Sequence, residues 1–480
     1  MTAHRSLRAV LASAAAALAV LTATPAAAAN PVPVPADGTS YFGVHLDWGN
    51  DGPAAYATRS GLRPASYGYF TGFPMSATEK SSLDAVVNTL VAQQSALFLT
   101  VEPFGGLSAV TDQAVADLAA TMSAYNSRGV PVFLRFAHEM NGSWYAWGQQ
   151  PSAYVAAFRR VAAAVHAAAP VTAMVWAPNY GGGYPFTGGT YAAAPGSADY
   201  RTLDTDASGS VTMADDPYAP YYPGDDAVDW AGLTLYHFGN AYPWQENETP
   251  EPGKFGQFLT GTYNGNGLYE DQTAVPDFYA GFATARGKPL AIAETSALYN
   301  ESPPKPGDSA YAIKNAWLQQ VYATATRDRF PLVKLVNWFE IRKYEAEARG
   351  VVDWRVTADP ALREQLLALV GTSRYVFAAG SQPPAPTDPT VPTPPGAPTG
   401  VTASSMPGRV TLSWTAPAPK PGGTVTGYVA CLSNVCRTLP ASATSTLFID
   451  VARKVSLKYS LHALNGDLAG EAVSGTVRTK

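Results

Sequence analysis

Hydrophobic residues in the first two thirds of the chain fall into short continuous runs, and longer helix-like or polar segments separate these runs. Most of the runs are apolar throughout, which is typical of parallel strands that are buried on both faces. There are eight of them: YFGVHLD, PASYGYF, ALFLTVEP, PVFLRFAHE, TAMVWAPN, WAGLTLYHF, PLAIAETS and LVKLVNWFE.

The intervening segments carry helix signals. Ser76 and Glu79 have the spacing of a capping box, which marks a helix start. A second segment repeats apolar residues at helical spacing, at Tyr154, Phe158, Val161 and Val165. Eight strands, each followed by a helix or a long loop, predict an α/β fold, a (β/α)8 TIM barrel over residues 38–378. A doubly wound open sheet is the alternative, but no Gly-rich phosphate fingerprint follows the first run.

The composition changes over residues 379–398, where SQPPAPTDPTVPTPPGAP offers almost nothing to bury. Such a Pro/Thr-rich stretch is extended and predicts a linker. Over residues 399–480, short β-type runs alternate with turns, which indicates a small immunoglobulin-like sandwich. This part resembles a fibronectin type III domain, with Trp414, Tyr428 and Tyr459 at the expected places. It is expected to be a spacer or accessory module, and a sugar-binding module is the alternative.

Residues 1–29 have the pattern of a secretory signal peptide. Arg5 and Arg8 precede an apolar stretch that runs to about Leu21, and small residues follow up to Ala29. The alternative is a membrane anchor, but the apolar stretch is shorter than the roughly 20 residues that a spanning helix needs. The protein is therefore expected to be secreted and extracellular, with no membrane partner.

The charge of the chain limits the classes of partner that it is expected to bind. The 480 residues carry a formal net charge of -5, and no Lys/Arg cluster after the signal peptide could follow a phosphate backbone. Nucleic acid is therefore not an expected partner, and the protein is expected to be a monomer.

The only two cysteines are Cys431 and Cys436. In an oxidising compartment they predict a disulfide that closes a hairpin, with two free thiols as the alternative.

Carboxylates and aromatic residues gather where the predicted strands end. The strand ends supply Asp47, Glu102, Glu139, Tyr236, His237, Glu294 and Glu340, and the neighbouring aromatic residues are Trp48, Trp144, Tyr145, Trp147, Trp176 and Trp338. Active sites of TIM barrels lie at this face. Aromatic rings suit the C–H faces of sugars, and a pair of carboxyl groups is what hydrolysis of a glycosidic bond requires. The expected partner is a polysaccharide.

Other chemistries fit the chain less well. His138 and Glu139 begin like the zinc pattern HExxH, but Gly142 stands where the second histidine belongs. The chain after the signal peptide contains no G-x-S-x-G, and the predicted barrel has no cysteine nucleophile. Catalysis is therefore expected to need no cofactor.

The segment HEMNGSWYAWG closely resembles the acid/base signature of glycoside hydrolase family 26, whose members are retaining barrel enzymes. FGVHLDWG, LTVEPFGG, VDWAGLTLY and AIAETS also resemble that family's pattern. The resemblance implies that Glu139 is the acid/base, that Glu294 is the nucleophile, and that an endo-acting enzyme cleaves β-1,4-mannan. Members acting on mixed-linkage β-glucan or β-1,3-xylan share the same pair. A barrel that binds polysaccharide without cutting it remains a third possibility.

Seven further residues are expected to bind the substrate or to support the pair: Arg135, His138, Glu102, Trp144, Trp147, Tyr236 and Trp338. Arg135 should point inward with Glu139, because strand side chains alternate, and it could keep Glu294 ionised. Tyr236 is a candidate for a hydrogen bond to the nucleophile. His138 would hold a substrate hydroxyl or orient a carboxylate, or it is a buried structural histidine. The three tryptophans are sugar platforms or packing residues.

A second cluster of polar residues precedes the sixth strand. Positions one, three, five, seven and twelve of a calcium loop are taken by Asp204, Asp206, Ser208, Ser210 and Asp215, with Gly209 at the turn. Ser208 at position five and Asp215 at position twelve depart from the usual pattern. The prediction is a structural Ca²⁺ that stiffens a long loop beside the cleft, and the alternative is a polar acidic loop.

Overall fold

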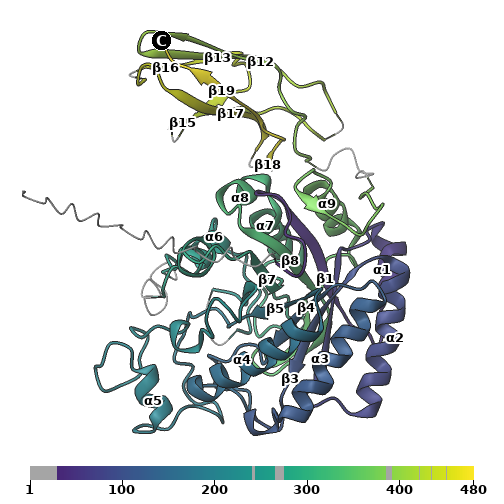
Figure 1. The fold of residues 1–480 in the computed structure, drawn as a ribbon. Helices are drawn as coiled ribbons and strands as arrows, with labels where there is room; N and C mark the ends of the chain where they lie inside the picture. Colours follow the sequence, from purple (N-terminus) through teal and green to yellow (C-terminus); the bar gives the residue numbers. More distant parts are fainter. Residues whose placement is uncertain are drawn as a thin grey trace, which may run out of the picture.

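The computed structural model describes residues 30–480, apart from 241–243, 265–274, 385–391, 421, 434, 450 and 467. The chain forms an α/β barrel followed by a β-sandwich (Figure 1), and the predicted fold class is confirmed. The predicted signal peptide, residues 1–29, lies outside the described residues. Among the helices of the described ranges, none has the length and apolar character to cross a bilayer.

All eight predicted strands are present and pair in parallel, in chain order. They are β1 (Ser40–Leu46), β2 (Ser66–Gly72), β3 (Ala96–Glu102), β4 (Val132–Phe136), β5 (Thr172–Trp176), β6 (Trp230–Thr234), β7 (Leu290–Thr295) and β8 (Val333–Glu340). Pairing of β1 with β8, from Tyr41 opposite Leu335 to Leu46 opposite Glu340, closes the barrel. The predicted open-sheet alternative is therefore excluded.

Helices follow the strands and cover the barrel (Figure 1). The described helices are α1 (Pro53–Ser60), α2 (Ala77–Gln93), η1 (Leu107–Ala109), α3 (Asp112–Ser127), α4 (Pro151–Ala168), α5 (Ala198–Leu203), η2 (Ala219–Tyr221), α6 (Lys254–Thr260), η5 (Tyr279–Thr284), α7 (Ala310–Tyr322), α8 (Thr324–Arg329) and α9 (Pro360–Val370). The predicted capping box of Ser76 and Glu79 is present at the start of α2. The predicted apolar face of α4, which includes Tyr154 and Phe158, is buried.

Strand alternation divides the core into two layers. On β4, Leu134 and Phe136 face the helices, whereas Phe133 and Arg135 face the barrel interior. The lower interior is packed with apolar side chains, and the rings of Phe133 and Trp230 lie edge-on at 4.9 Å between centroids. The upper interior is polar, since it holds Arg135 and its partners. Polar side chains therefore occupy the interior near the carboxyl ends of the strands, and apolar side chains fill the interior near the amino ends.

The chain after β8 forms a hairpin, β9 (Arg342–Glu345) with β10 (Gly350–Asp353), and later a short strand, β11 (Tyr375–Val376), which pairs with the start of β1. The sandwich consists of β12 (Thr399–Met406), β13 (Arg409–Thr415), β14 (Gly427–Leu432), β15 (Val435–Pro440), β16 (Ser445–Ile449), β17 (Ser456–Asn465), β18 (Leu468–Ala469) and β19 (Val473–Arg478). Its core contains Trp414 and Tyr428, with ring centroids 5.3 Å apart. The predicted disulfide is confirmed between Cys431 and Cys436, which face each other across β14 and β15.

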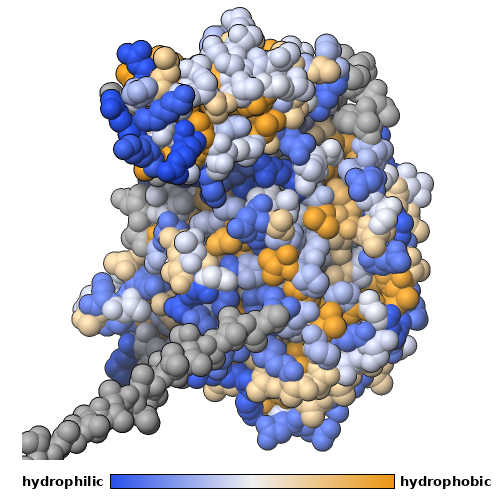
Figure 2. All heavy atoms as spheres, turned by 45° about the horizontal axis from the view of Figure 1, so that its top comes forward, coloured by the Kyte–Doolittle hydropathy of each residue, from blue (hydrophilic) through white to orange (hydrophobic). Residues whose placement is uncertain are grey.

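The sandwich contacts the barrel at the end opposite to the strand carboxyl ends. Strand β18 lies against α8, the helix that leads into β8 (Figure 1). Leu468 of β18 is buried within the core cluster of the barrel, and Ser373 donates a hydrogen bond to Glu471 at 3.3 Å. On the side of the molecule turned forward in Figure 2, hydrophobic residues lie in small groups among hydrophilic ones. The sandwich therefore leaves the carboxyl ends of the barrel strands uncovered.

Candidate active site

A β-bulge turns Glu294 into the barrel. Along β7, Ile292 faces the helices and Ala293 faces inward, so regular alternation would send Glu294 outward. On β6, however, Leu233 pairs with Ile292 and Thr234 pairs with Glu294, which leaves one extra residue in β7. Bulges re-aim side chains in this way beside active sites. Two successive residues of β7 therefore point inward, and the second of them is the carboxylate.

Inside the barrel Glu294 is held by two groups that the sequence predicted. Its Oε1 forms an ion pair with Nη2 of Arg135, and its Oε2 accepts a hydrogen bond from the Tyr236 hydroxyl at 2.7 Å. Burial would raise the pKa of Glu294, but the Arg135 guanidinium, the two histidines nearby and the Tyr236 hydrogen bond hold it well below its usual range. Glu294 is therefore ionised at neutral pH.

The backbone directly after β4 is strained, and this conformation directs Glu139 towards Glu294. Ala137 and Glu139 both have left-handed backbones, with φ of 47° and 53°, conformations that cost about 1 to 3 kcal/mol each for such residues. Two main-chain hydrogen bonds hold the segment: Ala137 N donates to Val101 O at 3.0 Å, and Glu139 N donates to Ala177 O at 2.9 Å. Neighbouring strands thus impose the conformation that aims Glu139.

The environment of Glu139 favours the protonated acid. Burial, followed by the negative charge of Glu294, raises the pKa of Glu139 to about 7, although Arg135 opposes the shift. The Trp144 indole donates a hydrogen bond to its Oε2 at 3.0 Å. The pair therefore has pKa values displaced in opposite directions, which is the arrangement that separates an acid from a nucleophile.

Glu102, at the end of β3, is a third carboxyl group of this pocket. Burial raises its pKa to about 7, and the charges of Arg135, Glu294 and Glu139 also act on it. The structure therefore brings Glu102, Arg135, Glu139, Tyr236 and Glu294 together. His138 lies beside them with 2% of its surface exposed, and its ring is tilted against that of Tyr145, with the centroids 4.9 Å apart. Its contact with a substrate hydroxyl stays a prediction.

Two threonines in the pocket were missed by the sequence analysis. Arg135 donates from Nε to Thr100 at 2.9 Å and from Nη1 to Thr234 at 3.5 Å. Both threonines stand two positions before a predicted site residue, Glu102 and Tyr236 respectively. The alternation that identified Arg135 would have found them also.

The predicted roles of several residues need correction. Trp147 and Trp338 have no exposed surface, so the prediction that they are sugar platforms is wrong. Trp147 stacks on Tyr145 at 4.4 Å and donates to the His138 carbonyl, and Trp338 faces α7, where its ring lies 6.0 Å from Tyr322. Arg135 is also fully buried, so it serves the carboxylate and does not contact the substrate directly.

Trp144 is the one predicted platform that reaches the surface, with 39% of its area exposed. The loop after β5 supports it, because the ring of Phe186 lies 5.1 Å away and edge-on. Ser143 fixes this loop by donating to the Phe186 carbonyl at 2.6 Å. Phe104, after β3, is 62% exposed above Trp147 and is a further aromatic surface that the sequence analysis did not single out.

Three other strand ends do not enter the pocket. Glu340 is buried and accepts hydrogen bonds from the main chain of Val356 and Thr357. His237 bonds to the Glu248 carbonyl and packs on Trp317 of α7. Asp47 accepts hydrogen bonds within the turn that follows β1. Each of these side chains forms its hydrogen bonds with other parts of the chain, so a polar residue at a strand end does not by itself indicate catalysis.

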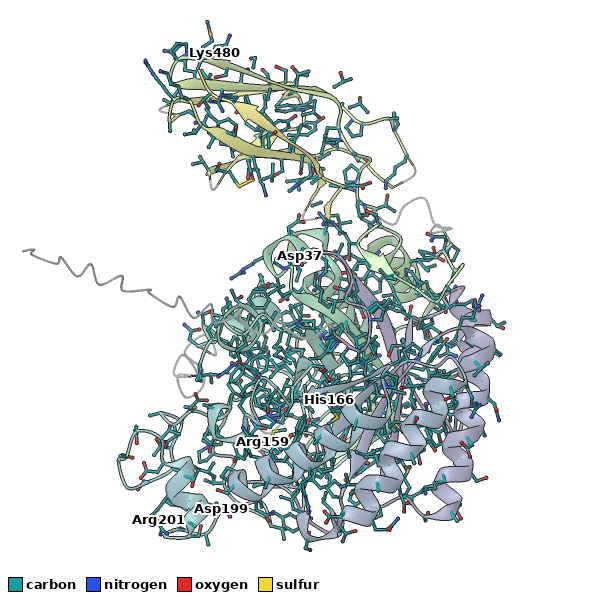
Figure 3. The ribbon with its side chains drawn as sticks, in the orientation of Figure 1. Asp37, Arg159, His166, Asp199, Arg201 and Lys480 are labelled. Atoms are coloured by element: carbon teal, nitrogen blue, oxygen red, sulfur yellow. A yellow bond between two sulfur atoms is a disulfide. The ribbon has the colours of Figure 1, made fainter. Side chains whose placement is uncertain are left out.

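The predicted calcium loop lies at the periphery of the barrel, after α5, whose Asp199 and Arg201 are labelled in Figure 3. One carboxylate oxygen from each of Asp204, Asp206 and Asp215 lies within 4.8 Å of the others. The carboxylate of Asp215 is buried and accepts main-chain hydrogen bonds from residues 205, 206 and 212. Ser208 donates to Ser210 O, so both serines belong to the same turn. The donor set suits a hard cation.

A known family model matches part of the barrel. Residues 87–207 match the model described as Glycosyl hydrolase family 26. This segment includes Glu102 and the whole region around Glu139. The resemblance that the sequence motifs indicated is therefore confirmed over this segment.

Three individual proteins are similar to this chain or to a part of it. Endoglucanase H of Acetivibrio thermocellus is 25% identical over 310 residues, which cover 63% of this chain but only 26% of that protein. A modular endo-β-1,4-mannanase structure from Cellulomonas fimi aligns over 92% of this chain and 94% of its own, with 16% identity and a TM-score of 0.44. The fibronectin type III domain of human collagen α-1(XX) aligns over 18% of this chain and 86% of its own, with 20% identity and a TM-score of 0.16.

The displaced pKa values predict the dependence of kcat/KM on pH. Glu139 must carry a proton to act as an acid, so kcat/KM should fall as the pH rises through about 7. Glu294 must be ionised, and its lowered pKa places the acidic limb well below the usual range of a glutamate. A rate profile from about pH 3 to about pH 9 measures both limbs. A basic limb near the ordinary carboxyl pKa of about 4.3 would contradict the assignment of Glu139.

Proposed function

We propose that this protein is a glycosidase of family 26, a secreted, retaining endo-β-1,4-mannanase. Glu294 is the nucleophile and Glu139 is the general acid and base. Three groups support them: Arg135 and Tyr236 hold Glu294, and Trp144 holds Glu139 and offers a ring to the sugar. The match to the family model supports the activity, and the polymer, the endo action and the export are further parts of the proposal.

The reaction is a double displacement. The Glu294 carboxylate attacks the anomeric carbon and the bond to the departing sugar breaks, while Glu139 gives its proton to the leaving oxygen. Water then attacks the glycosyl-enzyme, Glu139 accepts a proton from that water, and Glu294 leaves. The proton that Glu139 gave stays on the departed sugar, whereas the water supplies a new proton to Glu139 and its hydroxyl to the anomeric carbon, so both carboxyl groups return to their starting states. The product therefore keeps the anomeric configuration of the substrate.

The observation that carries the proposal is the opposite protonation of two carboxyl groups in one pocket. The ion pair with Arg135 and the Tyr236 hydrogen bond stabilise the charged form of Glu294. Burial and the charge of Glu294 favour the neutral form of Glu139. A barrel that only bound polysaccharide would need aromatic surfaces but no such pair. Hydrolysis by two carboxylates needs both protonation states.

The polymer is proposed with less direct support than the reaction. β-1,4-Mannan comes from the resemblance of the sequence motifs to family 26. The similarity to Endoglucanase H makes β-glucan the second candidate. That match spans about a quarter of the relative. β-1,3-Xylan is the third candidate. Trp144 and the loop that supports it line the side from which the leaving group departs, so this region is expected to decide between the polymers.

Replacement of each carboxylate tests the proposal. The substitution Glu139→Gln should lower kcat by about 10²- to 10⁴-fold, as expected for loss of a general acid, and Glu294→Gln should abolish turnover. Release of reducing sugar from galactomannan, glucomannan, barley β-glucan and β-1,3-xylan measures both variants. Glu471→Gln is the matched control, because Glu471 is exposed on the sandwich and lies at the far end of the barrel.

The outcomes separate the alternatives. Activity on mannans that disappears in both variants and survives in Glu471→Gln supports the whole proposal. Activity on another polymer with the same two losses keeps the mechanism and replaces the substrate. Full activity in both carboxylate variants, or binding of a polymer without any sugar release by the wild type, contradicts the catalytic pair.

We also propose that the loop from Asp204 to Asp215 binds Ca²⁺. The distance of 4.8 Å that spans its three carboxylate oxygens supports a shared cation. The four main-chain amides around Asp215 and Asp204 order the turn in advance, because they fix the carboxylates relative to one another. The cation would tie this peripheral loop together and would have no part in the reaction.

Calcium binding predicts a stability change. Addition of Ca²⁺ to chelator-treated protein should raise the melting temperature by about 2 to 5 °C, because the ion binds the folded loop. The substitution Asp206→Asn should remove this shift, since Asp206 is exposed and its replacement leaves the buried Asp215 in place. Calorimetry with Mg²⁺ as the comparison ion measures the effect. A melting temperature that Ca²⁺ and chelator leave unchanged contradicts the site.

A further inference from the structure

The bulge at Ala293–Glu294 leaves a main-chain carbonyl inside the barrel. Ala293 has no pairing partner on β6, because Leu233 pairs with Ile292 and Thr234 pairs with Glu294. The pairing with β8 also skips this point, between Ile292 and Thr295. A buried carbonyl without a hydrogen bond is costly. The chain must therefore supply donors to this oxygen if Glu294 is to stay turned inward.

Two side chains supply those donors. His45 of β1 places Nε2 at 2.8 Å from the Ala293 oxygen, and Asn337 of β8 places Nδ2 at 3.3 Å from the same atom. Both side chains are completely buried, and they come from the two strands that close the barrel. The carbonyl next to the nucleophile is thus held from outside its own strand.

Two glycines make room for these side chains. A Cβ atom at Gly68 would lie 1.9 Å from Nδ1 of His45, and one at Gly43 would lie 1.9 Å from Oδ1 of Asn337. Neither distance is tolerable for a real side chain, so β1 and β2 are shaped around the two donors. The His45 ring is further enclosed by Phe70 and Phe98, with centroids 5.3 and 5.8 Å away.

The protonation state of His45 agrees with a role as donor. Burial lowers its pKa to about 4, and the opposite charges of Glu294 and Arg135 partly cancel there. The ring is therefore neutral at neutral pH and carries a single proton. Because the Ala293 oxygen can only accept, that proton is on Nε2. Nδ1 is bare and has no hydrogen-bond partner among the described residues.

We propose that His45 and Asn337 are positioning residues that lock the bulge of β7, so that Glu294 faces the anomeric carbon. This inference rests on the proposed function, because it assigns the two residues to the nucleophile of that reaction. Neither residue touches the substrate, since both lie beneath Glu294 with no exposed surface. They act by fixing the main chain one residue before the reacting carboxylate.

Substitutions that remove or keep the donor test this role. His45→Met and Asn337→Leu each remove one donor, and kcat should fall about 10- to 100-fold with KM within about two-fold, because a small misplacement of a nucleophile is enough for such a loss. His45→Gln keeps an amide donor at a similar reach and should recover kcat to within about five-fold of the wild type. Ser66→Ala is the matched control, since Ser66 is buried beside Gly43 and its hydroxyl has no partner among the described residues.

A second readout separates positioning from loss of folded protein. A 2-deoxy-2-fluoro glycosyl fluoride of the disaccharide that the wild type releases should trap Glu294. The first-order rate constant for inactivation does not depend on how much of a variant is folded. It should fall by the same factor as kcat in His45→Met and Asn337→Leu, and it should be unchanged in Ser66→Ala.

The possible outcomes distinguish the positioning role of His45 and Asn337 from the proposed function. Inactivation of the wild type together with wild-type rate constants in His45→Met and Asn337→Leu overturns the positioning role and leaves the proposed function intact. Equal losses in His45→Gln and His45→Met overturn the role of the donated hydrogen bond. A wild type that neither cleaves a polymer nor reacts with the fluoride overturns the proposed function, and the positioning role falls with it.

Discussion

The ion pair between Arg135 and Glu294 is the interaction on which the rest of the site depends. A buried carboxylate is tolerated only when a partner compensates for the lost hydration, and Arg135 is that partner inside the barrel. Burial and the negative charge of Glu294 raise the pKa of Glu139 to about 7, and Arg135 opposes this shift. Thr100 and Thr234 fix the guanidinium from two further strands. Arg135 thus keeps Glu294 ionised, and the charge of Glu294 in turn favours the protonated form of Glu139.

Glu139 and Glu294 both depend on irregular backbone that hydrogen bonds from neighbouring strands hold in place. On β4, left-handed backbones at Ala137 and Glu139 aim the acid, and main-chain bonds to Val101 and Ala177 hold them. On β7, a bulge aims Glu294, and donors from β1 and β8 reach the buried Ala293 carbonyl that the bulge leaves without a strand partner. Neither catalytic carboxylate sits on a regular stretch of strand. The regular part of the barrel supplies the rigidity that makes both departures possible.

Sequence alone was sufficient for the barrel and for most of the pocket. Continuous apolar runs identified the eight strands because parallel strands are buried on both faces, and the alternation of side chains placed Arg135 with Glu294. The same logic did not reveal the bulge, since Ala293 and Glu294 look like any other end of an apolar strand. Of the two roles predicted for Trp147 and Trp338, sugar platform or packing residue, the structure shows packing. The burial of Trp147 depends on how the loop after β4 folds, and that of Trp338 depends on which face of β8 it occupies. For Trp338, that face turns toward α7.

The most direct test of the account is to identify the residue that bonds to the sugar. Protein inactivated with a 2-deoxy-2-fluoro glycosyl fluoride can be digested, and the labelled peptide can be sequenced by mass spectrometry. The account predicts a single label on Glu294, within the peptide that contains AIAETS. A label on Glu139 or Glu102 would contradict the assignment of roles that the ion pair with Arg135 implies.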